Sequence, residues 1–221
     1  MTRSILIVSG KGGVGKTTSA VNLAAALHGF GKNVLLVDAA LSTSDVGLHL
    51  GSPVAPINFH HVLAGKSKAR EAIYRHSSGL KVLPGSISLD DMKKAKPENM
   101  KKALSQLRRY ADFLIIDSAA GFGKEALHAM DAASELIVVT NSDLPSVTNA
   151  LKAIKIAESM GKAVTGCIVT RKKSKRSEMS LRNIAEMLEV EVLGIVPEDE
   201  AVNDALDKKD VLLHAYPRSK A

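Results

Sequence analysis

The feature of this sequence that most constrains its fold is a glycine-rich loop near the N-terminus. Residues 10–17, "GKGGVGKT", satisfy the pattern G-x-x-x-x-G-K-S/T and follow the apolar run at residues 4–9. Glycines let the backbone curl so that successive N–H groups face phosphate oxygens, and a helix beginning near Lys16 adds the positive end of its dipole. The pattern therefore predicts a strand, a phosphate-binding loop and a helix, in that order. The alternative is a glycine-rich turn that binds no ligand.

Seven short apolar runs alternate with amphipathic segments along the chain. They are rich in Val, Ile and Leu and occupy residues 4–9, 33–38, 80–85, 113–117, 135–141, 164–170 and 190–197. Continuous apolarity indicates strands covered on both faces, which is typical of a parallel sheet between helical layers. We therefore predict one α/β domain over residues 1–221: a doubly wound, mostly parallel sheet of the P-loop NTPase class, with helices on both faces.

Two of the amphipathic segments carry clear helix signals. Pro97 suits a first helical turn, and Asp143 is placed to cap a second helix that ends before Gly161. The apolar faces of these helices are formed by Met100, Ala103, Leu104 and Leu107 in the first and by Val147, Ala150, Leu151 and Ile154 in the second.

Composition and charge exclude several classes of protein. The sequence has no run of 18 or more uncharged apolar residues, and its first residues lack the apolar core and cleavage site of a signal peptide. The single cysteine, Cys167, excludes a disulfide framework and is expected to be an inert thiol in a buried strand. We therefore expect a cytoplasmic protein. Its net charge of +7 favours approach to anionic surfaces without identifying one.

Nucleotide chemistry assigns roles to four polar side chains. Lys16 is expected to neutralise the β- and γ-phosphates of ATP, and Thr17 is expected to offer its hydroxyl to Mg²⁺. Asp117 ends the apolar run at residues 113–117 and is the candidate carboxylate for holding Mg²⁺ through its water shell. Asp38, which ends the run at residues 33–38, is the second candidate. Either carboxylate could instead cap the turn that follows it.

Several segments resemble the MinD/ParA family of ATPases. "KGGVGKTT" at residues 11–18 looks like that family's deviant Walker A motif, and "DSAAGF" at residues 117–122 resembles its "D-x-P-A-G" segment. Further similarity lies at residues 37–51, 62–74, 80–85 and 194–202, so the resemblance runs from Ile5 to about Val211. It is greatest to MinD-like proteins of archaea and bacteria. It implies that ATP is bound by Gly12, Gly13, Val14, Gly15, Lys16, Thr17 and Thr18.

The resemblance also implies a role for Lys11, the other lysine of the loop. In the family, the matching lysine reaches across a dimer to the phosphates bound by the other subunit. A cation that offsets γ-phosphate charge only when two ATP-loaded subunits meet would make assembly depend on ATP. Lys11, Lys16 and Asp38 are therefore the candidate catalytic residues, and a homodimer is expected in the ATP state. The alternative for Lys11 is a solvated loop lysine.

At the end of the site that would hold the adenine base, the resemblance points to Arg171, Pro197, Glu198 and Asp199. The chain departs from the family there, because it has Thr170 before Arg171 where Asn is common, and "NSD" at residues 141–143 where "N-P-E" is common. Residues 197–199 could also form a strand-to-helix turn with an acidic cap.

One departure bears on the rate of hydrolysis. Family members usually read "D-x-D" after the second strand, and the second aspartate is associated with orienting the attacking water. This chain has Asp38-Ala39-Ala40, and a methyl group cannot accept a hydrogen bond from water. We therefore expect slow hydrolysis, unless the nearby Asp45 acts as a surrogate.

The implied function is a MinD-like switch in cell division or spatial positioning, with a regulatory protein as activator. MinD-like proteins usually carry one more helix, and often an amphipathic membrane anchor, after the segment that matches residues 211–221. We therefore expect any peripheral association with the inner face of the membrane to need a segment that this chain lacks. The alternatives are a ParA-like ATPase whose dimer binds non-specific DNA, which we favour less, and a non-hydrolysing nucleotide-dependent scaffold.

Three further groups of residues have simpler interpretations. The basic run "RKKSKR" at residues 171–176 could contact lipid headgroups or nucleic acid, but a solvated loop is the preferred interpretation. The adjacent His60 and His61 should diverge on a helix rather than form a metal-binding pair. The lysine-rich run at residues 92–102 is expected to be a solvated helix face.

Overall fold

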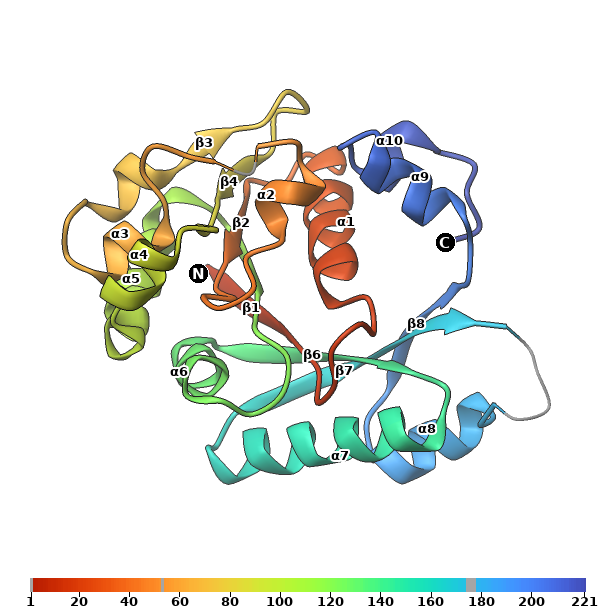
Figure 1. Ribbon diagram of the computed structural model, residues 1–221. Helices are drawn as coiled ribbons and strands as arrows, with labels where there is room; N and C mark the ends of the chain where they lie inside the picture. Colours follow the sequence, from red (N-terminus) through yellow and green to blue (C-terminus); the bar gives the residue numbers. More distant parts are fainter. Residues whose placement is uncertain (1, 53, 174–177) are drawn as a thin grey trace.

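An eight-stranded sheet organises the computed structural model, which describes residues 2–52, 54–173 and 178–221 (Figure 1). The strands, in chain order, are β1 (Arg3–Val8), β2 (Val34–Asp38), β3 (Tyr74–Arg75), β4 (Lys81–Leu83), β5 (Phe113–Asp117), β6 (Glu135–Asn141), β7 (Ala163–Lys172) and β8 (Val192–Pro197). Their order across the sheet is β3-β4-β2-β5-β1-β6-β7-β8, and all neighbouring pairs are parallel except β3 with β4. The predicted doubly wound sheet is confirmed, and all seven apolar runs form strands.

The central strands are buried because each lies between two apolar layers. Leu6 and Val8 of β1 belong to one buried cluster, whereas Ile5 and Ile7 of the same strand belong to a second cluster on the opposite face. Successive residues of a strand point to opposite faces, so a strand covered on both faces must be apolar at every position. This requirement explains the continuous apolar runs in the sequence.

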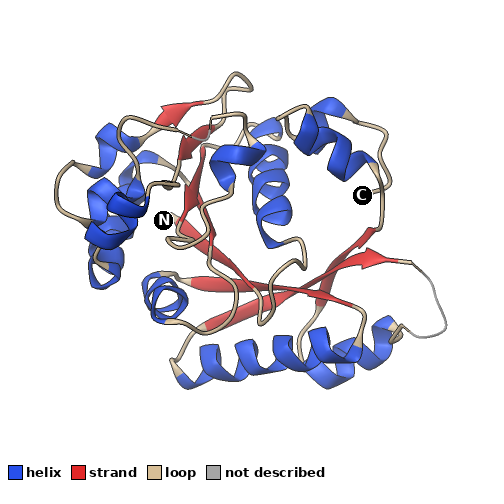
Figure 2. Ribbon diagram, in the orientation of Figure 1, coloured by secondary structure: helices blue, strands red, loops and turns tan. Residues whose placement is uncertain are grey.

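Helices cover both faces of the sheet (Figure 2). The first cluster packs α3 (Phe59–Leu63), α5 (Met100–Leu107), α6 (Lys124–Ala132), α7 (Leu144–Ser159) and α8 (Leu181–Leu188) against one face. The second cluster packs α1 (Lys16–Gly29) and α2 (Val46–His49) against the other face, beside α9 (Ala201–Asp207) and α10 (Leu212–Ala215). The remaining short helices are α4 (Leu89–Lys94) and the 3-10 turns Ala69–Ala72, Pro97–Asn99 and Arg108–Tyr110.

The two predicted helix signals are present, with one difference in the bounds of the first helix. Residues 97–110 form a 3-10 turn, then α5, then a second 3-10 turn, and the four predicted apolar residues of α5 are buried. Asp143 caps α7 by accepting a hydrogen bond from Ser146 N at 3.0 Å, and Gly161 follows the helix with a φ of +68°. Burial raises the pKa of Cys167 to about 11, which agrees with an inert thiol.

Two other features complete the fold. Strand β3 was not predicted, because two residues are too few to show a period, and it pairs with β4 only through Tyr74 and Arg75. Among the described residues, no helix is both long and apolar enough to cross a membrane.

Candidate functional site

The phosphate-binding loop leaves β1 and enters α1 at the position where the strand order reverses. β1 is flanked by β5 on one side and β6 on the other, and such a switch point leaves a crevice beyond the carboxyl ends of the strands. Gly15 precedes α1 with a φ of +89°, a left-handed conformation that favours glycine. Gly10 lies so close to α7 that an added Cβ would be 2.2 Å from Asn149 O. Both glycines are therefore required by the backbone path.

The predicted loop residues differ in exposure. Val14 is buried in the cluster that packs against α1, whereas Gly12 and Gly13 are exposed at the tip of the loop. Thr18 lies in the first turn of α1, and its hydroxyl is 3.5 Å from His49 Nε2 on α2. The tip is therefore open to solvent, while the base of the loop is fixed by packing.

Lys16, Thr17 and Asp117 meet at the base of the loop. Thr17 Oγ1 donates a hydrogen bond of 2.6 Å to Asp117 Oδ2, and Lys16 Nζ lies 3.9 Å from Asp117 Oδ1. The meeting follows from the sheet, because Asp117 ends β5 beside β1, which feeds the loop. Three residues predicted to act on the phosphates and Mg²⁺ are thus in one place.

The environment of Asp117 fits a hard cation. Its Oδ1 atom is buried and has no hydrogen-bond partner among the described residues. Burial raises the pKa of Asp117, and the charge of Lys16 and the Thr17 hydrogen bond oppose that rise. A carboxylate oxygen that accepts no hydrogen bond, next to a threonine hydroxyl, is a donor set that Mg²⁺ prefers. Asp117 and Thr17 could therefore hold Mg²⁺ at this position.

Asp38 lies directly beside Asp117 at the end of β2, and its two oxygens are already engaged. Oδ1 accepts from Ala40 N at 3.1 Å and Oδ2 accepts from Val46 N at 3.2 Å, so Asp38 shapes the loop between β2 and α2. Burial, and then the charge of Asp117, raise the pKa of Asp38 well above its usual range. These contacts match the turn-capping alternative, and the catalytic role of Asp38 remains a prediction.

Ala40 follows in the same loop and is buried, with 2% of its surface exposed. Its carbonyl accepts from Ser44 Oγ at 3.1 Å, and its side chain offers no polar atom. Asp45 is exposed. Burial is the main cause that raises the pKa values of Asp38 and Asp117, and the charge of Asp45 is a smaller cause that acts in the same direction on both. The surrogate proposed for Ala40 thus lies near the site without being fixed in it.

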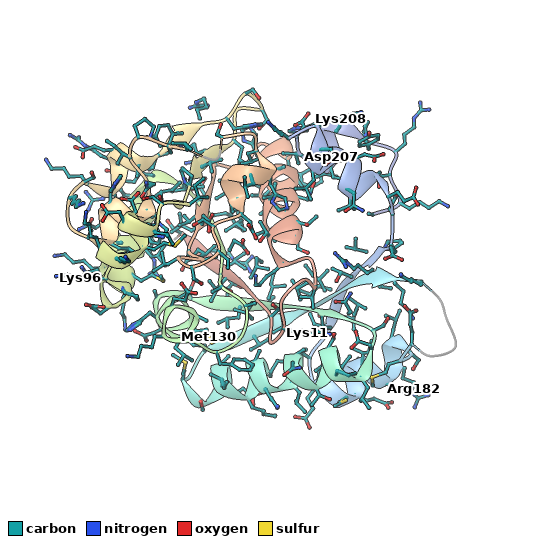
Figure 3. The ribbon with its side chains drawn as sticks, viewed as in Figure 1. Lys11, Lys96, Met130, Arg182, Asp207 and Lys208 are labelled. Atoms are coloured by element: carbon teal, nitrogen blue, oxygen red, sulfur yellow. The ribbon has the colours of Figure 1, made fainter. Side chains whose placement is uncertain are left out.

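Lys11 has a different environment from Lys16. Its side chain is exposed at the loop (Figure 3), and no described carboxylate lies within ion-pair distance of it. Its main-chain oxygen accepts from Ser9 Oγ at 2.8 Å, which holds the backbone while the side chain stays in solvent. Burial opposes the lowering of the pKa of Asp143, the cap of α7, whereas the Ser146 hydrogen bonds and then the charge of Lys11 lower it. The two lysines of one loop therefore lie near different carboxylates, Lys16 beside Asp117 and Lys11 on the side of Asp143.

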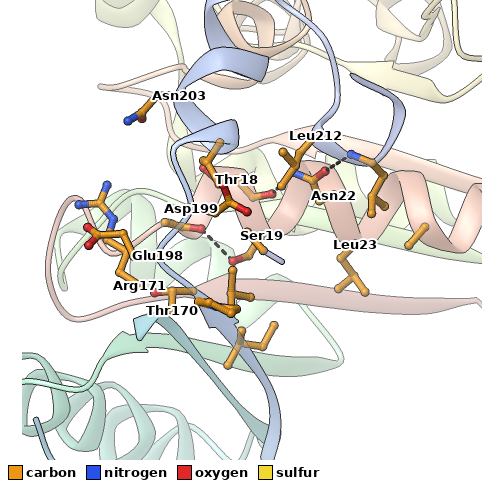
Figure 4. Close-up of a pocket in the computed structure, with 18 residues that line it drawn as sticks. Thr18, Ser19, Asn22, Leu23, Thr170, Arg171, Glu198, Asp199, Asn203 and Leu212 are labelled. Atoms are coloured by element: carbon orange, nitrogen blue, oxygen red, sulfur yellow. Dashed lines mark hydrogen bonds between the residues drawn. The ribbon is translucent and has the colours of Figure 1, made fainter. Parts of the chain in front are cut away.

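A cavity of about 380 Å³ continues from the loop along α1 (Figure 4). Its walls come from α1, from the ends of β7 and β8, and from the segment that contains α9 and α10. The predicted nucleotide residues that line it are Gly15, Thr18, Arg171, Pro197, Glu198 and Asp199. The four residues expected at the base end are therefore brought together, in the same cavity as the loop residue Gly15.

Two of these residues also make structural contacts. Asp199 accepts from Ala201 N at 3.0 Å, from Ser219 Oγ at 2.8 Å and from Lys220 N at 3.0 Å, and the hydrogen bond from Ala201 is the main reason that its pKa is lowered. Glu198 forms an ion pair of 2.5 Å with Lys173. The alternative of an acidic turn before a helix thus describes Asp199, whose role in base binding remains a prediction.

Sequence reasoning missed several residues of the site. Asn22 lines the cavity one turn after Thr18, and its Nδ2 donates to Thr18 O at 2.9 Å, so helical spacing could have identified it. Ser42 in the loop after β2 donates to Glu125 of α6 from both its N–H, at 3.0 Å, and its hydroxyl. No local pattern connects residues 83 positions apart.

The adjacent histidines and the two lysine-rich runs have distinct surroundings. His60 donates to Leu41 O at 2.8 Å and accepts from Ser86 N at 3.1 Å, whereas His61 contacts Asp91, so the histidines diverge. All five lysines at residues 92–102 are exposed. In the basic run, the predicted solvated loop is wrong for Arg171 and Lys172, which end β7, and Lys172 pairs with Glu178 at 2.6 Å. Residues 174–176 lie outside the described residues.

Comparisons with known proteins agree with this geometry. Residues 5–213 match the family described as the CobQ/CobB/MinD/ParA nucleotide binding domain. An uncharacterized ATP-binding protein of Methanocaldococcus jannaschii is 41% identical over 221 residues, which are 100% of this chain and 84% of that protein. The septum site-determining protein MinD of Pyrococcus horikoshii, solved with Mg-ADP, has a TM-score of 0.96 at 33% identity and covers 100% of this chain and 91% of its own. A chain of the MinC:MinD cell division protein complex of Aquifex aeolicus has a TM-score of 0.87 at 29% identity, covering 96% and 88%.

Proposed function

This chain belongs to the CobQ/CobB/MinD/ParA family of nucleotide-binding domains, and from that premise we propose that it is a MinD-type ATPase that works as an ATP-dependent dimer. ATP and Mg²⁺ are its cofactors, in keeping with the family and with the Mg-ADP complex of the P. horikoshii relative. The dimer would be a switch in cell division or spatial positioning. The observation that carries the proposal is the contrast between Lys16, which lies 3.9 Å from Asp117, and Lys11, which is exposed and forms no ion pair in the described part of the chain.

Within one subunit, the residues of the chain bind the nucleotide without forming a covalent bond to it. Bound Mg²⁺ supplies charge neutralisation at the phosphate oxygens. Thr17 and Asp117 are placed to hold the ion, and Lys16 and the loop N–H groups are placed to balance the remaining phosphate charge. Asp38 keeps the loop after β2 against this site through its bonds to Ala40 N and Val46 N.

Across two subunits, the exposed Lys11 would complete the charge balance. A lysine that lacks an ion pair in its own subunit can face a second nucleotide when two loaded subunits meet. The association would then be stronger with ATP than with ADP, because the γ-phosphate adds negative charge at the contact. The buried methyl group of Ala40 adds no group that could orient water, so the dimer would hydrolyse ATP slowly.

A regulatory protein is the expected partner of this dimer. The solved MinC:MinD complex supports this expectation, because it shows a similar chain assembled with another protein.

The test compares the oligomeric state and the activity of the same samples. Size-exclusion chromatography with light scattering, run without nucleotide, with ADP and with ATP, should show a dimer only with ATP, and phosphate release should be slow. Lys11→Ala should remain a monomer with ATP while it still binds nucleotide, and Lys32→Ala, an exposed lysine beyond α1, serves as the matched control. A wild-type monomer in ATP, or a Lys11→Ala variant that still dimerises, would contradict the proposal.

A further inference from the structure

Thr170 at the end of β7 contacts the phosphate-binding loop from a distant part of the chain. Its Oγ1 atom lies 2.6 Å from Val14 O and 3.1 Å from Thr140 O, and the residue is 4% exposed. The contact joins residues 156 positions apart. Because a threonine hydroxyl has one hydrogen to donate, the shorter contact identifies Val14 O as the main acceptor.

The acceptor lies where the loop turns into α1. Val14 O precedes Gly15, and an added Cβ at Gly15 would lie 3.8 Å from three atoms of the Thr170 side chain. The same side chain therefore packs on the loop as well as bonding to it. The other end of this turn is held within its own segment, because Ser19 Oγ donates to Gly15 O at 2.8 Å.

The direction of the hydroxyl limits what Thr170 can do for a nucleotide. Thr170 lines the cavity (Figure 4), but its one donor hydrogen is committed to main-chain oxygens. It is thus poorly placed to read the edge of a base. A buried carbonyl such as Val14 O would lose its partner if the hydroxyl were removed, and loop residues would be freer to move.

We propose that Thr170 is a positioning residue that fixes the phosphate-binding loop, so that its loop N–H groups are preorganised for phosphate. The inference rests on the nucleotide binding within the proposed function. It assigns the effect of Thr170 to the phosphates of any nucleotide, not to the identity of the base.

The experiment separates phosphate binding from base binding. Thr170→Val keeps the shape and removes the hydroxyl, and Thr170→Ser keeps the hydroxyl. Thr165→Val is the matched control at the other end of β7, where the exposed Thr165 hydroxyl donates to Glu135 at 3.0 Å. The probes are Mg-ADP and Mg-tripolyphosphate, which has no base. Thr170→Val should weaken both about tenfold, or ~1.4 kcal/mol, whereas the serine and control variants should bind within about threefold of wild type.

Two results would overturn the inference. Wild-type affinity of Thr170→Val for both probes would show that the hydroxyl does not position the loop. Weaker binding of Mg-ADP alone would show that Thr170 reads the base. If Thr170→Val does not unfold cooperatively, Thr170→Ser and Thr170→Ala replace it, because they differ only by the hydroxyl, and equal affinities of this pair would also overturn the inference. The dimer proposal fails on a different result, a monomer in ATP, so the two failures are distinguishable.

Discussion

At the scale of single residues, the two loop lysines should differ in their effect on nucleotide affinity. Lys16→Ala removes the ammonium group that lies 3.9 Å from Asp117 Oδ1 and faces the phosphate site. The affinity for ATP should fall at least about tenfold, or ~1.4 kcal/mol, as measured by calorimetry. Lys11→Ala is the matched control. Because Lys11 is exposed, its replacement should leave the affinity of the monomer for ATP nearly unchanged. Equal affinities for Lys16→Ala and wild type would disprove the loop assignment.

Ala40 tests the rate of hydrolysis at the same scale. Ala40→Asp adds a carboxylate that could orient the attacking water, so phosphate release should rise at least several-fold and the ATP dimer should become shorter-lived. Losses of water-positioning or general-base groups commonly cost on the order of 10²-fold in rate, so a gain of this kind is measurable. Ala40→Asn is the isosteric, uncharged control, and thermal unfolding checks that either polar side chain is tolerated at this buried position. If both rates match that of wild type, other groups hold the water.

At the scale of elements, the contact between Ser42 and Glu125 joins the loop after β2 to α6. The loop contains Ala40 and follows Asp38, the last residue of β2, and α6 follows Asp117, the last residue of β5. The contact therefore connects the segments that follow the two strand ends of the site. Glu125→Ala should therefore increase amide hydrogen exchange at residues 40–46, while β2 itself should stay protected. Glu98→Ala, at an exposed glutamate in a 3-10 turn, is the control. Unchanged exchange in the loop would show that its other contacts, among them those of Asp38 with Ala40 N and Val46 N, order it without Glu125.

A second contact between elements, at the opposite end of the sheet, should show in the pH dependence of stability. Arg3 of β1 bonds Glu135 of β6 through Nε at 2.8 Å and a second guanidinium nitrogen at 2.7 Å, and this hydrogen bonding lowers the pKa of Glu135. A lowered carboxyl pKa stabilises the fold above the unfolded-state value, and the stabilisation is lost as pH falls through the folded-state value. Glu135→Gln should therefore reduce the free energy of unfolding by up to about 1 kcal/mol at neutral pH.

Urea unfolding from neutral to acidic pH measures this difference. The gap between wild type and Glu135→Gln should close as the pH falls below the usual glutamate range, because Glu135 then becomes protonated. Glu200→Gln, at an exposed glutamate, should show no such gap at any pH. If the difference in the free energy of unfolding persists in acid, the loss of stability in Glu135→Gln comes from altered packing and not from the lost carboxylate charge.

At the scale of the whole molecule, the sequence was sufficient to predict positions that follow from chain order, and it failed where contacts depend on distant packing. Asp38 and Asp117 were each predicted to end a strand because each ends a continuous apolar run, and the structure places them side by side at one edge of the sheet. The hydroxyl of Thr170 could not be assigned to Val14 O, because this bond depends on how two distant segments pack. The sequence left two roles open for Asp199, a base contact or a cap, for the same reason. Two of its hydrogen-bond donors lie at residues 219–220, about 20 positions further along the chain.

The cavity beside the loop also fixes the time at which the site can first exist in a newly made chain. One wall contains Gly15 and Thr18, which are among the first residues to leave the ribosome, and another contains residues 196–199, 202 and 203. A ribosome adding about 5–20 residues per second needs roughly 10–40 s to make the chain between the two walls. During that interval the cavity beside the phosphate loop lacks this wall, so we expect the nascent chain to gain tight nucleotide binding only late in its synthesis.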